Sequence, residues 1–351
     1  MPKDVYNVNI KEQYPLISPK ELKSLLPVSE SLKNNVITFR EEITAILNHE
    51  DRRMLFITGP CSVHDPEAAL EYAEKLSVLR KRYIDSLYIV MRVYFEKPRT
   101  NLGWKGFIVD PYLDGSYDIQ QGLKDARRLL TEITKMGLPS GNEVLDPIIP
   151  QYISDLVSWS AIGARTTESQ THREIASGLS MPIGFKNGTD GDLGKAVNAI
   201  LSAQHSHSFI GIDQEGKTNI FKTRGNRTGH LIMRGGSGGP NYYEEDIEKA
   251  EDMLSAIGVK PSILIDCSHA NSGKNPARQE RVLRSALDLR AHGHESVRGI
   301  MLESNLFPGR QDLTGSLSSL KYGVSITDAC IGWDETEKLI NNSAEAVGML
   351  K

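Results

Sequence analysis

The sequence has few of the features that mark secreted, membrane or nucleic-acid-binding proteins. Its 351 residues include only three cysteines, Cys61, Cys267 and Cys330, which are odd in number and far apart. A disulfide framework is therefore not expected, and the thiols should stay reduced. Residues 1–6 lack the charged-then-apolar pattern of a secretory signal. Together these absences predict a cytoplasmic protein.

Long apolar runs and charge of one sign are also lacking. No run approaches the length needed to cross a bilayer. Lys and Arg total 41 against 45 Asp and Glu, a formal net charge of −4, and no basic block indicates nucleic-acid binding. There is no internal repeat and no low-complexity tract. A globular protein with one large α/β barrel or two ordinary domains is expected from this length.

From residue 54 onward, short apolar runs alternate with amphipathic stretches, which is typical of a parallel sheet with crossover helices. Candidate strands span residues 54–57, 87–92, 141–145, 160–164, 182–186, 229–234, 262–266 and 298–303. These eight strand–helix units predict an α/β fold of the (β/α)8 TIM barrel type. Residues 209–212 and 218–221 flank a polar turn and predict an inserted β-hairpin, about residues 207–224, outside the barrel.

We expect the catalytic barrel to span residues 51–351 and a helical extension to span residues 1–50. Ser18-Pro19-Lys20-Glu21 matches a capping box at a helix start. A second helix is predicted from an apolar stripe at Leu32, Val36, Phe39, Ile43 and Ile46. Covering the base of the barrel or contacting another subunit would both bury this stripe, and we expect the extension to serve oligomerisation or regulation.

Cys61 lies in the loop that follows the first predicted strand. Gly59-Pro60 forces a sharp exit from that strand, and Asp65-Pro66 predicts the start of the next helix. In α/β proteins, chemistry is placed in such loops. A lone cysteine is as often a small buried hydrophobe, so its role depends on what the other strands carry.

A polar or metal-capable side chain stands at or just beyond the end of every predicted strand. In order, these are Cys61, Arg92 with Lys97, Glu143, Arg165, Lys186, Arg234, His269 and Glu303. Any one alone would be read as a solvated or capping residue. Eight at the face where barrels bind substrates predict an active site.

Five of these side chains form a predicted cationic floor: Arg92, Lys97, Arg165, Lys186 and Arg234. Five cations in one pocket repel one another and are expected to need an anionic ligand of high charge density. A glycine-rich loop after Arg234 offers backbone N–H groups to a phosphate. Because Lys97-Pro98-Arg99-Thr100 forms a second basic cluster, two phosphorylated substrates are expected.

Three of the other strand-end side chains, with one later carboxylate, form a candidate metal site: Cys61, His269, Glu303 and Asp328. This mixture of soft and hard donors suits one divalent ion, and Mn, Fe, Co, Zn and Cu all remain open. The alternatives are a structural histidine at 269 and a helix cap at 328. Three other histidines are rejected as ligands because they match no strand end, namely His64, His172 and His230.

Four motifs give the sequence a family resemblance: Gly59-Pro60-Cys61-Ser62 and residues 91–100, 163–170 and 184–191. They resemble the type I 3-deoxy-D-arabino-heptulosonate 7-phosphate (DAHP) synthases. The resemblance implies a metal-dependent barrel, usually dimeric or tetrameric, that condenses phosphoenolpyruvate with D-erythrose 4-phosphate and releases phosphate. This reaction is the first step of the shikimate pathway to chorismate and the aromatic amino acids.

Carried onto matching positions, the resemblance implies a role for each site residue. The implied metal ligands are Cys61, His269, Glu303 and Asp328. The residues implied to bind phosphoenolpyruvate are Arg92, Lys97, Arg165, Lys186 and Arg234. The residues implied to bind erythrose 4-phosphate are Arg99, Thr100 and Asp328. Lys97, Cys61 and His269 are expected to be catalytic, with Lys97 the candidate proton donor. The loop Ser237-Gly238-Gly239 is one residue longer than in several members, which carry a lysine there, so affinity rather than reaction type is expected to differ.

Members of this family are commonly inhibited by one aromatic amino acid. The matching positions here are Pro150, Gln151, Leu179, Ser180, Phe209, Gly211 and Phe221. Paralogs inhibited by phenylalanine tend to have serine at the position of Gly211, and glycine leaves room for a phenol hydroxyl. Tyrosine is therefore the predicted effector.

Three alternatives are weighed against this prediction. Another phosphoenolpyruvate-condensing synthase would share the cationic floor but not residues 97–100. A Schiff-base aldolase would use Lys186, which the anion-binding floor already explains. A catalytically inactive barrel that senses aromatic amino acids should have lost metal ligands, and all four are present.

Overall fold

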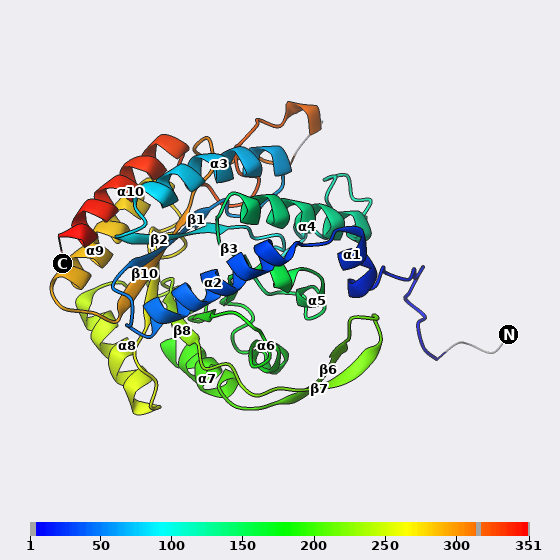
Figure 1. The fold of residues 1–351 in the computed structure, drawn as a ribbon, viewed down its shortest axis with the longest axis horizontal. Helices are drawn as coiled ribbons and strands as arrows, with labels where there is room; N and C mark the ends of the chain where they lie inside the picture. Colours follow the sequence, from blue (N-terminus) through cyan, green and yellow to red (C-terminus); the bar gives the residue numbers. More distant parts are fainter. Residues whose placement is uncertain (1–4, 314–316, 350–351) are drawn as a thin grey trace.

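The computed structural model describes residues 5–313 and 317–349 and has a closed parallel barrel at its centre (Figure 1). The barrel strands, in chain order, are β1 (Met54–Gly59), β2 (Leu87–Arg92), β3 (Ser140–Glu143), β4 (Trp159–Ile162), β5 (Ile183–Lys186), β8 (Gly229–Met233), β9 (Ile263–Asp266) and β10 (Val297–Glu303). Each strand pairs in parallel with the next along the chain, and β10 closes the ring by pairing with β1. The predicted (β/α)8 barrel is confirmed.

The strands are buried along their whole length because helices cover the outside of the barrel. The helices that follow the strands are α3 (Pro66–Arg82), α4 (Ile119–Lys135), α5 (Pro150–Ile153), α6 (Gln170–Ala176), α7 (Leu193–Ala203), α8 (Glu244–Ala256), α9 (Gln279–Ala291) and α10 (Trp333–Gly348). Short 3-10 turns span Ser154–Leu156, Pro276–Arg278 and Leu317–Ser319. Among the described residues, none of the helices has the length and apolar character that a membrane span requires.

The turn after β1 shows why a glycine stands there. A Cβ atom at Gly59 would lie 2.5 Å from the backbone oxygen of Arg92, so only glycine allows this close approach of β1 to the end of β2. The chain then passes Cys61 and enters α3, where the Asp65 side chain accepts hydrogen bonds from the N–H groups of Glu67 and Ala68. The predicted cap is confirmed. Cys61 is thereby held between two fixed elements.

The N-terminal extension closes one end of the barrel. Its helices are α1 (Pro19–Leu25), which starts with the predicted capping box at Ser18 and Glu21, and α2 (Glu30–Leu47). The stripe on α2 is buried from Val36 onward. Ile43 and Ile46 pack in one cluster with side chains from the barrel interior, including Leu55. Of the two roles left open for this stripe, the structure shows that it covers the base of the barrel.

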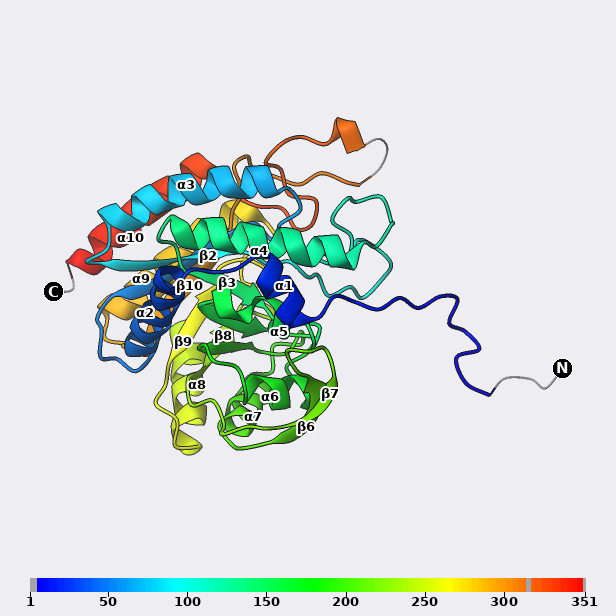
Figure 2. The ribbon, with the colours of Figure 1, turned by 45° about the vertical axis from the view of Figure 1, so that its right-hand side comes forward.

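The inserted hairpin is confirmed outside the barrel. It consists of β6 (Ser208–Ile212) and β7 (Thr218–Lys222), which pair antiparallel and lie between α7 and β8 in the chain. In Figures 1 and 2 the hairpin curves along the side that carries α5 and α6. The N–H of Lys20 donates to the Gln214 oxygen in the hairpin turn at 2.8 Å, so α1 and the hairpin are joined.

His230, which was rejected as a metal ligand, is a buried residue of the barrel interior. The indole N–H of Trp159 donates to its Nε2 at 3.0 Å, and Nδ1 bonds the Thr228 oxygen at 3.1 Å. Burial lowers the pKa of His230 from 6.5 to about 4. Since Nε2 must accept, the imidazole stays neutral in the folded state.

This burial predicts a pH-dependent stability. As the pH falls below 6.5, His230 is protonated in the unfolded chain, whereas in the folded chain it stays neutral down to about pH 4. The free energy of unfolding should therefore fall by about 3 kcal/mol between pH 7 and pH 4 from this residue alone. His230→Gln, which keeps one acceptor and one donor, should show a shallower pH dependence in urea unfolding. Identical slopes for the two proteins would contradict the assignment.

Candidate active site

A cavity of about 400 Å³ opens at the carboxyl ends of the barrel strands. Its lining includes the following predicted site residues: Arg92, Lys97, Arg99, Thr100, Arg165, Lys186, Arg234, His269 and Asp328. Cys61 and Glu303 lie buried directly beneath it. The structure therefore brings all the residues predicted for metal and substrates to one mouth of the barrel.

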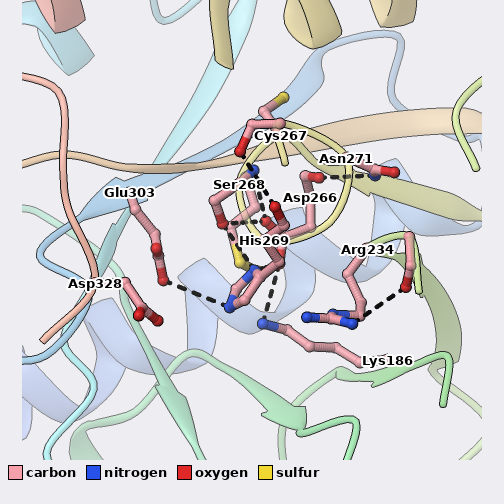
Figure 3. A network of polar contacts seen from close by, with 12 residues as sticks. Lys186, Arg234, Asp266, Cys267, Ser268, His269, Asn271, Glu303 and Asp328 are labelled. Atoms are coloured by element: carbon pink, nitrogen blue, oxygen red, sulfur yellow. Dashed lines mark hydrogen bonds and ion pairs between the residues drawn. The ribbon is translucent and has the colours of Figure 1, made fainter. Parts of the chain in front are cut away.

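Three of the predicted metal ligands form a tight group. One donor atom each from Cys61, Glu303 and Asp328 lies within 4.8 Å of the other two. The Cys61 thiol is 3.7 Å from Asp328 Oδ2. His269 stands at the edge of this group, with Nε2 3.8 Å from Glu303 Oε1 (Figure 3).

The imidazole of His269 is oriented by its other nitrogen. Nδ1 lies 2.9 Å from Asp266 Oδ2 and 2.8 Å from the Ser268 hydroxyl, which leaves Nε2 turned toward Glu303. A carboxylate behind a histidine is the usual arrangement that fixes the tautomer of a metal ligand. The thiol, imidazole and two carboxylates therefore fit one divalent ion of the transition series.

A lysine contacts the thiol. Lys97 Nζ donates to Cys61 Sγ at 2.7 Å and lies 4.0 Å from Asp328 Oδ2. Burial and then the charge of Glu303 raise the pKa of the Cys61 thiol. Burial alone would lower the pKa of Lys97, but Cys61 and Glu303 raise it above its ordinary value. A thiol whose pKa is raised holds its proton more tightly, so metal binding there would have to release that proton.

Two of the floor cations are already paired with buried carboxylates. The guanidinium of Arg92 donates to Glu303 at 3.0 Å and to the Cys61 and Pro60 oxygens. Lys186 Nζ lies 3.1 Å from Asp266 Oδ2, and both side chains are almost fully buried. The expectation that the five cations need an anionic ligand to be stable was wrong in part, because buried carboxylates offset two of them.

The other floor arginines keep their charge available. Arg165 Nε donates to the Thr100 hydroxyl at 3.1 Å, and Arg234 donates to the Gly235 oxygen at 3.2 Å. Neither has an ion pair with a carboxylate within residues 5–313 and 317–349. Burial lowers the pKa of Arg234; the charge of Asp266 opposes this in part, and the charge of Arg165 adds a smaller lowering. These two side chains can thus receive a phosphate.

Two functional side chains were missed in the sequence. Asp266 pairs with both Lys186 and His269, and its signal was readable, since a charged residue ends an otherwise apolar strand. Lys274 lines the same cavity but lies in a loop five residues past His269, where no strand end marks it. Glu143, which was expected at a strand end, also lines the cavity and has a buried carboxylate oxygen with no hydrogen-bond partner among the described residues.

A second cavity, of about 320 Å³, lies beside the hairpin. Its lining includes the predicted effector residues Pro150, Gln151, Leu179, Phe209, Gly211 and Phe221. The rings of Phe209 and Phe221 stack on each other, with centroids 5.7 Å apart, and both lie beside Gly211. Ser180 does not line it. It is exposed and borders the groove next to α2 instead, because the chain turns outward after Leu179.

The whole chain resembles characterised proteins. A family model described as the DAHP synthetase I family matches residues 28–341. The "Phospho-2-dehydro-3-deoxyheptonate aldolase, Tyr-sensitive" of Escherichia coli K12 is 50% identical over 341 residues, which cover 97% of this chain and 96% of that protein. The "Trp-sensitive" protein of that name from Enterobacter agglomerans is 51% identical over 332 residues, 95% of each. The solved "Phospho-2-dehydro-3-deoxyheptonate aldolase" of Francisella tularensis SCHU S4 superposes with a TM-score of 0.95 at 46% identity and covers 98% of this chain and 100% of its own.

Proposed function

The chain belongs to the DAHP synthetase I family, and we propose how its cavity carries out that family's reaction. The enzyme condenses phosphoenolpyruvate with erythrose 4-phosphate and water to give DAHP and inorganic phosphate. The observation that carries our assignment of residues is that a metal-binding group and unpaired arginines share one cavity.

Phosphoenolpyruvate is held by the cationic floor, namely Arg92, Lys97, Arg165, Lys186 and Arg234. Arg92 and Lys186 are fixed by Glu303 and Asp266, so they offer preorganised donors at little entropic cost. Arg165 and Arg234 are not ion-paired among the described residues, and their positive charges stabilise the phosphate as it leaves. Two of the residues that bind phosphoenolpyruvate are therefore fixed by buried carboxylates, and two have no carboxylate partner among the described residues.

Cys61, His269, Glu303 and Asp328 hold one divalent ion, with Mn, Fe, Co or Zn as candidates. When bound, the ion supplies Lewis acidity toward the aldehyde oxygen. Arg99 and Thr100, with Asp328, hold erythrose 4-phosphate at the rim. Lys97 keeps a proton at Nζ because its pKa is raised, and it delivers this proton to the alkoxide formed as the enol carbon attacks the aldehyde.

A phosphate-release assay tests this assignment. Phosphate should appear only when both substrates are present, should stop when a chelator removes the metal, and should return when Mn²⁺ is added. Release from phosphoenolpyruvate without the aldehyde, or full activity in excess chelator, would contradict it.

The cavity beside the hairpin binds an aromatic amino acid effector, and tyrosine is our proposal. Relatives named Tyr-sensitive and Trp-sensitive are about equally identical to this chain, so overall identity does not distinguish the effector. The choice of effector rests on a local feature of the cavity. Gly211 lines this cavity beside the stacked rings of Phe209 and Phe221, and its lack of a side chain leaves room there for the phenol hydroxyl. Inhibition by phenylalanine, with tyrosine inert at the same concentration, would refute this choice.

Gly211→Ser should weaken tyrosine inhibition. A Cβ at this position would stand 3.2 Å from two ring carbons of Phe221, so the side chain must narrow the cavity. We expect the half-inhibitory tyrosine concentration to rise by about tenfold or more, equivalent to ~1.4 kcal/mol, while uninhibited activity stays the same. Ile210→Ser, on the exposed face of the same strand, serves as control. Unchanged tyrosine inhibition in Gly211→Ser would contradict the assignment.

We propose that the N-terminal extension, residues 1–50, links regulation to assembly of a homodimer or homotetramer. The segment before α1 runs away from the barrel (Figure 2) and exposes Val5, Tyr6, Val8 and Tyr14. Helix α1 is linked to the effector cavity through the hairpin turn: the N–H of Lys20 donates to the Gln214 oxygen, and the Gln214 side chain donates to that of Gln151 at 2.9 Å. Sedimentation of the full chain and of a chain lacking residues 1–16 tests this. An unchanged oligomer with unchanged tyrosine inhibition would contradict it.

A further inference from the structure

The loop after β9, residues 269–275, carries two side chains into the catalytic cavity and strains the backbone at both. His269 and Lys274 have φ angles of 52° and 59°, in the left-handed region that disfavours residues with a Cβ. Both line the cavity. Strain of this kind persists where the surrounding structure enforces it, and its usual location is a functional site.

The surrounding structure does enforce this loop. The N–H of Lys274 donates to the His269 oxygen at 2.7 Å, which closes the loop on itself. Asn271, buried between them, donates to the Met233 and Asp266 oxygens and accepts from the N–H of Asn241. The position of Lys274 is therefore tied to that of His269.

The charge of Lys274 is available for a ligand. Its ammonium has no ion pair and no hydrogen bond within the described parts of the chain. An exposed lysine is usually solvated, but this one combines an unpaired charge, a strained backbone and a place in the cavity wall.

We propose that Lys274 binds the phosphorylated aldehyde substrate by donating to its phosphate. This inference rests on the proposed function. The rim position favours the aldehyde, because the floor cations Arg92 and Lys186 are buried, whereas Lys274 is exposed like Arg99 and Thr100. A lysine acts on phosphate as a mobile point charge, which suits a substrate that must enter and leave over the rim.

Three variants at this position separate binding from folding. Lys274→Gly and Lys274→Asn remove the cation with residues that tolerate the left-handed backbone, and Lys274→Arg keeps the charge. Lys274→Gly should melt at or above the wild-type temperature, because it relieves the strained φ. Lys249→Gln, which removes one exposed charge from α8, is the control for net charge.

We expect the KM for erythrose 4-phosphate to rise about tenfold in Lys274→Gly and Lys274→Asn, and to stay within threefold of wild type in Lys274→Arg. The Kd of phosphoenolpyruvate, measured by calorimetry with Mn²⁺ present, should change less than about twofold. A KM for erythrose 4-phosphate like that of wild type, or an equal rise in the Kd of phosphoenolpyruvate, overturns the inference. Failure of the proposed function is distinguishable, since the wild-type enzyme would then release no phosphate.

Discussion

Cys61→Ala should lower the rate of phosphate release by about 1,000-fold, equivalent to ~4 kcal/mol of transition-state stabilisation. The thiol is the only soft donor in the candidate metal group, and its sulfur lies 3.7 Å from Asp328 and 2.7 Å from Lys97. Removing it leaves an imidazole and two carboxylates around a wider space. The metal retained after desalting, measured by atomic emission, should fall together with the activity.

Cys267→Ala is the matched control for this prediction. Cys267 is as fully buried as Cys61, but it packs in the apolar core and belongs to no metal-capable group among the described residues. Its loss should cost about 1 kcal/mol of stability and little activity. If Cys61→Ala kept wild-type activity and metal content, or if both variants lost activity equally, the metal assignment would be wrong.

Lys186→Met should reduce both activity and stability strongly. Lys186 forms an ion pair with Asp266, whose side chain is fully buried. Without the ammonium, the carboxylate keeps the contact with His269, the hydrogen bonds from Ser268 and the more distant charges of Arg92 and Arg234. Breaking a buried pair on one side costs about 3–5 kcal/mol of unfolding free energy. Phosphoenolpyruvate would also lose one of its proposed donors.

A double variant separates the two effects. Lys186→Met with Asp266→Asn removes the uncompensated charge and should recover about half of the lost stability without restoring activity. Lys195→Met removes a partly exposed cation paired with Glu168 and Asp190 and should change stability by less than about 1 kcal/mol. Urea unfolding of the four proteins checks this. Wild-type stability in Lys186→Met would contradict the structural role of the pair.

The structure and the family match bear differently on the three alternative functions. Another phosphoenolpyruvate-condensing synthase is excluded, because the match to the DAHP synthetase I family spans residues 28–341. A Schiff base at Lys186 is disfavoured, since its amine is already held by the buried Asp266 carboxylate at 3.1 Å. An inactive sensor is disfavoured by the intact group of metal-capable side chains.

The barrel could be predicted because its strands are short, apolar and separated by recognisable breaks and caps. Asp65-Pro66 starts α3 as its sequence requires, and the hairpin turn contains the expected glycine and polar residues. Convergence of the strand-end side chains then followed from closure of the barrel, which brings all carboxyl ends to one face. The strand ends differed by one or two residues, which is the ordinary uncertainty of such boundaries.

Pairing between side chains could not be predicted in the same way. The contact of Asp266 with Lys186 joins two strands that are not neighbours in the sheet, so no sequence spacing encodes it. Lys274 depends on a strained loop that lacks any periodic signal. Ser180 was wrong as a lining residue because the direction of the chain after Leu179 is set by tertiary packing.

The account depends on one cavity holding both the metal and phosphoenolpyruvate. An anomalous difference map from crystals grown with Mn²⁺ and phosphoenolpyruvate tests this most directly. It should show one Mn²⁺ peak among Cys61, His269, Glu303 and Asp328, with the substrate phosphate on Arg165 and Arg234 in the same cavity. A metal peak elsewhere in the molecule, or phosphoenolpyruvate bound in a different cavity, would contradict the account.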